Sequence, residues 1–380
     1  MINQIKTFSF WFGLTWTLMT VCLSEVAISQ DGEIELSGFF TTTYSQSDDS
    51  AYYLGDVHSG GINKDGSFLG TLMGINLASQ VSERISFASQ LLASAEGNEN
   101  QDHFMVALDW AFVTVHLNND FGLRAGKIKL PVGLVNEYVD VGTAYPWIRP
   151  PELIYTEQAS GPQATRESFV GGSLVFNKYW GEFDLSVDVY GGEIDLEEMH
   201  IKKMRGLRFS ADWQDQFQFQ VSAYQGQMIA EDPNSPMGAM MHEQDHAAVV
   251  VGGSCDWNNL VFYAEYALVD MDIQMMTMGM TELSSALDGE AYYFTVGYRI
   301  SRWLPHFTHQ EWDRDNGLQH SIDTAGLNYQ LFPTTVLKIE YSAVSTQAGA
   351  MMMEPVTGLF SSLPESDPVS IISTSLSVTF

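Results

Sequence analysis

The sequence predicts an all-β protein, specifically an antiparallel β-barrel that spans a membrane. Three observations support this fold class. Apolar and polar residues alternate strictly over segments of about ten residues from Gln30 to the C-terminus, with no helical stripe of any length. The connections between these segments alternate between short polar turns and long loops. The last segment ends on an aromatic residue, Phe380.

Composition excludes several other classes. The 380 residues carry 47 Asp and Glu against 17 Lys and Arg, a formal net charge of -30, so the chain lacks the basic surface that a nucleic-acid binder needs. Hydrophobic residues make up 45% and aromatic residues 12%, which is too much apolar surface for a disordered chain. A helical membrane protein needs spans of about 20 apolar residues, and only the extreme N-terminus comes near that length.

The N-terminal segment, residues 1–29, has the features of an export signal. Lys6 supplies the positive charge, residues 8–23 form the apolar core, and Ala27 to Ser29 form a small-residue cleavage site. Residues 30–380 are then expected to form one domain. That domain contains a single thiol, Cys255, so no intramolecular disulfide is expected.

The alternation divides the chain into about sixteen strands. In 183–190, for example, Phe183, Leu185 and Val187 share one face, while Asp184 and Asp188 fall on the other. The expected strands are 33–45, 67–79, 85–95, 103–116, 120–129, 166–178, 182–193, 204–213, 216–227, 246–256, 259–270, 289–300, 304–313, 320–331, 334–346 and 368–380.

Loop lengths favour a barrel over a β-sandwich, in which strands alternate as well. The short turns are 82–85, 118–120, 179–182, 212–216, 256–259, 301–303 and 332–335. The long loops include 46–66, 130–165, 228–245, 271–288 and 347–367. Short turns on one side and long loops on the other are typical of an outer-membrane barrel, and an even strand number places both ends of the barrel at the turn side.

Aromatic residues mark the turn side. Trp180, Trp213, Trp257 and Trp303 lie at or beside short turns, where an aromatic girdle is expected at the membrane interface. The alternative is that they are core tryptophans of a soluble β-protein. Phe380 at the end of the last strand resembles the signal that outer-membrane barrels present to their assembly machinery.

The connection 130–165 differs from the other long loops because it combines five prolines with many apolar residues, which would be wasted on a solvated loop. The third long loop of a sixteen-stranded porin folds into the barrel and narrows the pore, and this segment occupies the same ordinal place. In architecture, residues 30–380 therefore resemble the bacterial outer-membrane porin superfamily, including the general diffusion porins.

A more specific likeness lies in FGLRAGKIKLPVGLVNEYVDVGTAYPWIRPPELIY, residues 121–155, which looks like the porins grouped with the phosphate-selective porins O and P. There a G-K-I-K-x-P-x-G run followed by a Pro-Pro segment marks the start of the constriction loop. Phosphate selectivity in that group resembles a ladder of lysines and arginines, and this chain has few candidates for one. The resemblance therefore does not identify the solute.

Strand parity places charged residues on the pore wall, where they would select the solute. The inward bases are Arg124, Arg208, Arg299 and Lys338, and the inward acids are Glu35, Asp109, Asp184, Asp188, Asp212, Glu265 and Glu340. The 130–165 loop adds Glu137, Asp140, Glu152 and Glu157 against Arg149 as its constriction residues. This excess of acid predicts a cation-leaning pore in which loop carboxylates face wall arginines; the alternative is that much of the acidity is solvated loop surface.

Four bases have outward parity near the loop-side strand ends: Lys127, Lys129, Lys203 and Arg205. A lipid-facing charge at mid-bilayer costs about 2–4 kcal/mol, so these are expected at headgroup depth, where lipopolysaccharide phosphates could pair with them, or in water as loop residues.

Methionine is concentrated in three loops, which hold 11 of the 18. Thioethers beside imidazole suit soft metals, which makes Met275, Met276 and His242 weak candidates for a surface copper site. Adaptable packing at the barrel mouth is the simpler explanation, so no metal and no cofactor are expected.

No enzyme motif such as GxSxG, HExxH or a P-loop occurs, and none of the Ser, His and Asp residues forms a recognisable catalytic set. The sequence thus predicts a porin in the outer membrane of a Gram-negative bacterium, passing small hydrophilic solutes and ions by passive diffusion, with a homotrimer suggested by fold analogy. The alternative is a narrow or plugged barrel that binds a surface partner or mediates adhesion through its long loops.

Overall fold

The computed structural model describes residues 34–56, 60–95, 104–155, 168–195, 199–230, 244–276, 282–286, 288–351 and 354–380. The expected signal segment, 1–29, lies outside these residues. Within them the chain is almost entirely β-strand.

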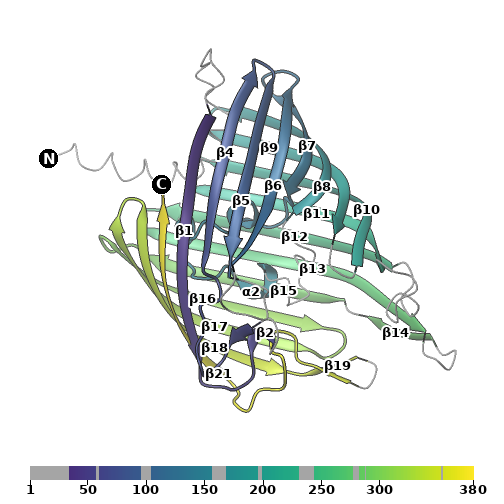
Figure 1. Ribbon diagram of the computed structural model, residues 1–380, viewed down its shortest axis with the longest axis vertical. Coiled ribbons are helices and arrows are strands. Elements are labelled where there is room, and N and C mark those ends of the chain that lie inside the picture. Colours follow the sequence, from purple (N-terminus) through teal and green to yellow (C-terminus); the bar gives the residue numbers. More distant parts are fainter. Residues whose placement is uncertain are drawn as a thin grey trace.

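Sixteen antiparallel strands close into a barrel, because β1 pairs with β4 on one side and with β21 on the other (Figure 1). The first eight strands around the barrel are β1 (Ile34–Ser47), β4 (Leu72–Ser82), β5 (Ile85–Ser94), β6 (Met105–His116), β7 (Phe121–Lys129), β8 (Ser168–Trp180), β9 (Phe183–Asp195) and β10 (Met199–Trp213). The other eight are β11 (Phe217–Ala230), β12 (Gln244–Trp257), β13 (Leu260–Met276), β15 (Gly289–Tyr298), β16 (Trp303–Arg314), β17 (Gln319–Phe332), β18 (Thr335–Gln347) and β21 (Val369–Thr379).

Each of the sixteen predicted strands is present, and the closed barrel confirms the predicted fold class. One strand boundary that differs is the start of β10, which lies at Met199 rather than near 204. A bulge between Lys202 and Arg205, with Lys203 at a positive φ of 54°, interrupts the alternation there but not the strand. Alternation of apolar and polar residues cannot reveal a strand on the far side of such a bulge.

The two ends of the barrel differ, as Figure 1 shows. The tight turns, the start of β1 and the C-terminus lie at one end, which runs from the top to the left of the view. The loops at the other end contain the short strands β2 (Tyr53–Asp56), β3 (Gly60–Ile62), β14 (Glu282–Ala286), β19 (Gly349–Met351) and β20 (Glu354–Val356). The two ends are called the turn end and the loop end below.

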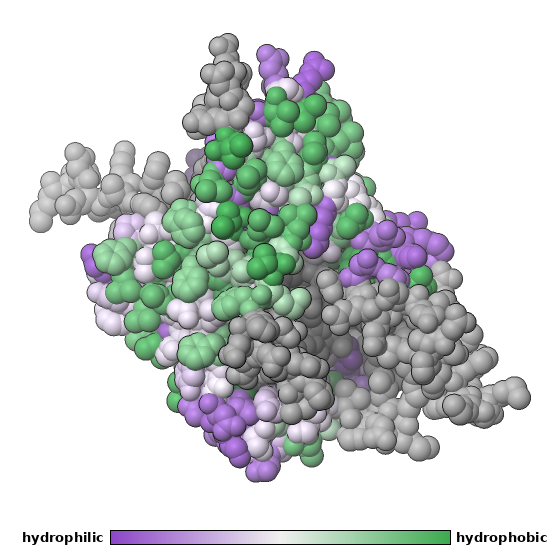
Figure 2. Space-filling view, in the orientation of Figure 1, coloured by the Kyte–Doolittle hydropathy of each residue, from purple (hydrophilic) through white to green (hydrophobic). Residues whose placement is uncertain are grey.

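The outer face of the barrel is apolar. Leu36, Val106, Val170 and Ile372 are all at least half exposed, although a soluble sheet would cover such side chains. Figure 2 shows apolar side chains across the front strands and hydrophilic ones gathered toward the two ends. None of the helices in the described part of the chain is long and apolar enough to cross a bilayer. A closed barrel with an apolar outer band is the form in which strands span a membrane.

The turn end carries exposed aromatic rings. Trp180 is 75% exposed and Trp257 50% exposed, which excludes the alternative that they are core residues. Trp213 stacks between Phe183 and Phe217, with ring centres 6.3 and 5.4 Å away. These rings have the placement expected of an interfacial girdle.

Candidate functional site: a loop across the barrel lumen

The inside of the barrel is occupied by L3, the connection between β7 and β8, whose residues 130–155 are described. L3 contains two short helical segments, η1 (Asn136–Tyr138) and α2 (Glu152–Tyr155), and α2 lies within the outline of the barrel in Figure 1. Its apolar residues are almost completely buried: Leu130, Val135 and Leu153 have no exposed surface. L3 thus folds inward.

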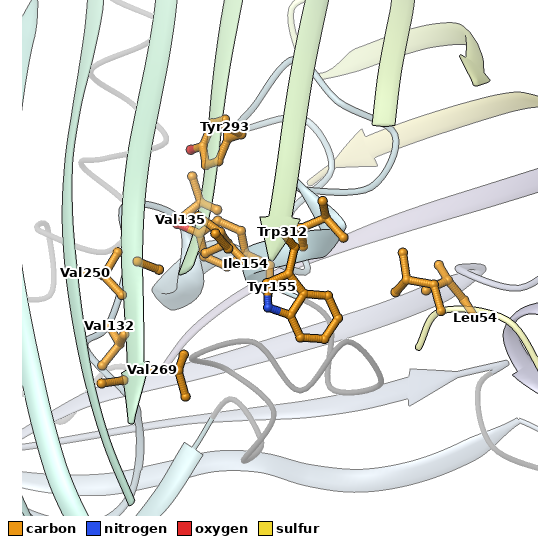
Figure 3. Close-up of a cluster of buried hydrophobic side chains, with 14 of the residues drawn as sticks. Leu54, Val132, Val135, Ile154, Tyr155, Val250, Val269, Tyr293 and Trp312 are labelled. Atoms are coloured by element: carbon orange, nitrogen blue, oxygen red, sulfur yellow. Dashed lines mark hydrogen bonds between the residues drawn. The ribbon is translucent and has the colours of Figure 1, made fainter. Parts of the chain in front are cut away.

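Apolar packing holds L3 against one part of the wall. Val132, Val135 and Ile154 of L3 belong to one buried cluster with inward side chains of β12, β13, β15 and β16, including Tyr293 and Trp312 (Figure 3). Porin-type walls usually carry polar residues inside. Here the inner face of these strands also carries a group of apolar residues, and L3 packs against it.

Glu265 of β13 binds two separate parts of L3. One carboxylate oxygen accepts a hydrogen bond from the backbone N–H of Leu134 at 2.7 Å. The other accepts from the hydroxyl of Tyr293 at 2.8 Å and from the hydroxyl of Tyr155 in α2. Glu265 therefore ties the start and the end of the described loop to the same point on the wall.

Lys338 and Glu340 of β18 fix the middle of L3 through its backbone. Lys338 Nζ donates to the carbonyls of Tyr145, at 2.8 Å, and Trp147. Glu340 accepts from the N–H of Ile148 at 2.8 Å. Both side chains are nearly inaccessible to solvent, so these contacts replace the water that the charges lose.

Arg149 fixes the far side of L3 to the strands that close the barrel. Its guanidinium donates to Ser45 Oγ of β1 at 3.0 Å and to Ser373 Oγ of β21 at 3.2 Å, and its Nε pairs with Glu152 at 3.0 Å. Glu152 also accepts from the amide of Gln310 at 3.1 Å. L3 therefore spans the lumen from β7 to β1.

Lys129 corrects one prediction made from strand parity. Parity places Lys129 outside, at headgroup depth, but its side chain is only 4% exposed and its Nζ lies 3.1 Å from Asp109 and 3.0 Å from Asp140 of L3. The register of β5 with β6 skips Asp109, and this bulge turns its carboxylate inward toward Lys129. Lys203 and Arg205 are exposed, as expected for outward bases.

Glu137 of η1 forms an ion pair with the wall. Its carboxylate lies 2.6 Å from Nη1 of Arg208 on β10, and the other Nη of Arg208 contacts Asp188 on β9. Burial raises the pKa of Glu137, but Arg208 and Arg124 lower it more, so the pKa lies below the usual value for glutamate. A loop carboxylate thus faces wall arginines, as in the predicted arrangement.

Two small cavities lie beside L3. The larger, about 50 Å³, lies on its turn-end side and is lined by Tyr138, Asp212, Asp215, Ser254 and Asp256, among others. The smaller, about 10 Å³, lies between L3 and β7–β9. A volume of about 10–15 Å³ holds one water molecule. L3 therefore leaves water-sized space beside it.

The other predicted site residues are dispersed. Arg124 faces inward with its guanidinium over the ring of Phe112, 5.3 Å from the ring centre. Asp184 lies near the turn end of the inner wall, and Arg299 pairs with Asp256. Glu157 and His242 lie outside the described residues, as do the side chains of Met275 and Met276.

No group of His, Cys, Asp and Glu within the described ranges could hold a metal ion.

Several residues that hold L3 are missing from the sequence prediction. Trp147 donates its indole N–H to Thr295 Oγ1 at 2.9 Å and to Thr308 Oγ1 at 3.0 Å. Asn328 donates to the carbonyl of Pro146 at 2.7 Å. The site prediction named only charged wall residues. The same inward parity also places Thr295, Thr308 and Asn328 on the inner wall and could have identified them.

Comparison with solved structures identifies the fold. An anion-selective porin from Comamonas acidovorans matches with a TM-score of 0.61 at 10% identity, covering 92% of this chain and 100% of that one. The outer-membrane channel DcaP of Acinetobacter baumannii gives 0.58 at 11% identity, covering 93% and 98%. Salmonella typhi OmpF, solved with daunomycin, gives 0.55 at 13% identity, covering 92% and 98%.

The fold is therefore that of the bacterial outer-membrane porins, which confirms the resemblance of the sequence to them. The apolar outer band agrees with a barrel that spans a membrane. No protein-family model and no curated protein matches the sequence.

Proposed function

We propose that this chain forms a narrow channel through the outer membrane for passive diffusion of small hydrophilic solutes and ions, with a preference for cations. The observation that carries the proposal is the acidic lining on the turn-end side of L3. Asp212, Asp215 and Asp256 line that cavity, and Asp184 lies directly opposite Asp212 on β9. Arg299 of the wall is already paired with Asp256. Carboxylates in a confined polar space attract cations.

The charged residues between L3 and the wall strands β6–β10 also support a preference for cations. Four carboxylates, those of Asp109, Glu137, Asp140 and Asp188, face three bases, Arg124, Lys129 and Arg208. This near balance would favour dipolar solutes and small cations over anions.

The test is single-channel conductance and reversal potential of the refolded protein in a planar bilayer under a KCl gradient. We expect small steps and a reversal potential of cation-selective sign. The double variant Asp212→Asn/Asp215→Asn should reduce cation selectivity, because it removes two charges without changing side-chain size. Asp120→Asn, at an exposed ion pair with Lys178 on a turn, is the matched control. Unchanged selectivity in the double variant would contradict the role of the acidic lining.

The second candidate is a surface-binding or adhesion barrel. The observation that favours it is the extent to which L3 fills the lumen, from Lys129 on β7 to Ser45 on β1. In that case the long loops would contact the partner and the inserted barrel would conduct no current. The same bilayer recording therefore separates the two functions.

The proposal extends to the oligomeric state of the barrel, its assembly signal and its contacts with lipopolysaccharide. One neighbour, in-vitro folded OmpT of Vibrio cholerae, is described as a trimer form, and a homotrimer is proposed here. Phe380 would present the assembly signal to the barrel-assembly machinery. The exposed Lys203 and Arg205 would pair with lipopolysaccharide phosphates at headgroup depth.

A further inference from the structure

The two cavities beside L3 are separated by a single helical turn. The larger one is lined by Tyr138, and the smaller one is lined by the preceding residue, Glu137. Both residues belong to η1. The smaller cavity lies toward β7, β8 and β9, and the larger one lies toward the turn ends of β10, β11 and β12. η1 therefore contributes to the lining of both cavities.

The smaller cavity is lined by buried polar groups that have no protein partner. Ser173 Oγ and Tyr190 OH are unpaired although these residues are only 6% and 3% exposed. Arg124 Nε is unpaired as well. Buried polar atoms in folded proteins are almost always hydrogen-bonded, and water satisfies those that protein groups do not. These atoms therefore indicate where water stands inside the barrel.

L3 packs differently on the two sides of the lumen. Toward β12, β13, β15 and β16 its contacts are dry, with Val132, Ile154 and Tyr155 against apolar wall residues (Figure 3). Toward β7–β10 the apolar cluster continues through Phe169, Ile194 and Ile201, and beside it η1 makes an ionic contact through Glu137 and Arg208. An ion pair beside water can separate without leaving an apolar void, whereas the packed side cannot open without one.

We propose that solutes pass L3 through the two cavities, first beside β7–β9 and then along the turn ends of β10–β12, and that the Glu137–Arg208 pair closes this path. The inference rests on the proposed channel function. When the pair separates, the passage is lined by Arg124, Ser173, Asp188, Tyr190 and Arg208 on the wall and by Glu137 on L3. Its solutes are small hydrated ions and dipolar molecules, because opposite charges line its two sides.

Cysteine reporters test the path. Ser173→Cys places a thiol in the smaller cavity and Ser254→Cys places one in the larger cavity. Ser342→Cys, an inward position on β18 where the hydroxyl pairs with Thr324 at 2.8 Å, is the matched control on another part of the wall. Each is made in a Cys255→Ser background, since Cys255 is a free thiol beside the larger cavity and could react with the reagent itself. All variants are checked for the heat-dependent gel mobility of a folded barrel.

Each variant is recorded in a planar bilayer before and after a quaternary-ammonium methanethiosulfonate reagent is added. We expect modification to remove at least half of the current in Ser173→Cys and Ser254→Cys and to leave Ser342→Cys unchanged. Adding Glu137→Gln should raise the conductance before modification at least two-fold and speed the modification of Ser173→Cys, because the closing pair is lost.

Block at Ser342→Cys but not at Ser173→Cys would overturn the path and leave the channel function intact. Equal conductance with and without Glu137→Gln would overturn the role of the pair. If no variant conducts, the channel function fails and the path fails with it. The two proposals are therefore tested separately.

Discussion

Lys338 binds Tyr145 of L3 in two ways. Its Nζ donates a hydrogen bond to the Tyr145 carbonyl at 2.8 Å and lies 4.8 Å from the centre of the Tyr145 ring. Lys338 itself is 1% exposed. A buried ammonium is costly unless it is fully solvated by protein groups, and here L3 supplies those groups. The wall thus depends on the loop as much as the loop depends on the wall.

Replacing this lysine should therefore loosen the whole loop. Lys338→Met keeps much of the side-chain length but removes the donors to Tyr145 and Trp147 and leaves Glu340 buried beside a neutral residue. We expect the free energy of unfolding to fall by about 2–4 kcal/mol. The free energy of unfolding is measured by urea titration in detergent, with tryptophan fluorescence as the signal. Lys178→Met, at an exposed turn-end ion pair, should cost less than about 1 kcal/mol. Equal losses in the two variants would contradict the role of Lys338.

Trp147 should contribute through both its ring and its N–H. The residue is 2% exposed, and its indole N–H is shared between Thr295 and Thr308. Trp147→Phe should cost about 1–2 kcal/mol and Trp147→Ala about 3–5 kcal/mol, since alanine also leaves a cavity. Trp180→Phe, at a 75% exposed position, should change stability by less than about 0.5 kcal/mol. The same urea titration tests all three, and a neutral Trp147→Ala would show that L3 is not held there.

Acid should open the path beside L3. Arg208 and Arg124 hold the pKa of Glu137 below its usual value despite the opposing effect of burial. A lowered pKa means that the ion pair contributes fully above the unfolded-state value of about 4.3 and is lost as the pH falls through the lower folded-state value. Mean conductance should stay level from about pH 7 to 5 and rise below about pH 4.

The matched variant for this pH profile is Glu137→Gln, which lacks the titrating group. Its conductance should be high throughout and should lack the rise at acid pH. Asp188 also contacts Arg208 and keeps part of the arginine charge compensated in the variant. A wild-type profile indistinguishable from that of Glu137→Gln would contradict the prediction.

Phe380 should matter for assembly more than for stability. Its backbone pairs with Gly38 through two hydrogen bonds of 2.8 and 2.9 Å, which any residue could form, and its side chain is 68% exposed. Phe380→Ala should refold in detergent with a stability within about 0.5 kcal/mol of wild type. In cells, the amount of protein in the outer-membrane fraction should fall several-fold. An unchanged amount in that fraction would show that Phe380 is not the signal.

Strands and their order could be predicted from the sequence because each barrel strand is a local pattern with period two. The inward parity of Asp188, Arg208, Glu265 and Glu340 follows from the same rule and is present in the structure. Lys129 was placed on the wrong face because it is the last residue of β7, where the chain leaves the wall for L3, and its ammonium turns to Asp109 of β6 and Asp140 of L3. A periodic pattern does not show where a strand gives way to a loop that folds inward.

Many contacts of L3 could not be predicted, because they join a wall side chain to a backbone group of the loop. Tyr145, Pro146 and Ile148 are bound through their carbonyls or N–H, which every sequence has. Neither could the apolar inner wall around Tyr293 and Trp312 be recognised. A strand that is apolar on both faces gives no sign of which face meets lipid and which meets a loop.

L3 follows the fifth strand of the barrel but binds side chains of strands that come much later in the chain, such as Glu265, Gln310, Lys338 and Ser373. Its partners do not exist in space until the C-terminal half of the wall has formed and β21 has met β1. Docking of the loop and closure of the wall are therefore coupled late events in folding. A barrel interrupted before its last strands would present the apolar residues of L3 to water, where a chaperone or a protease could bind them.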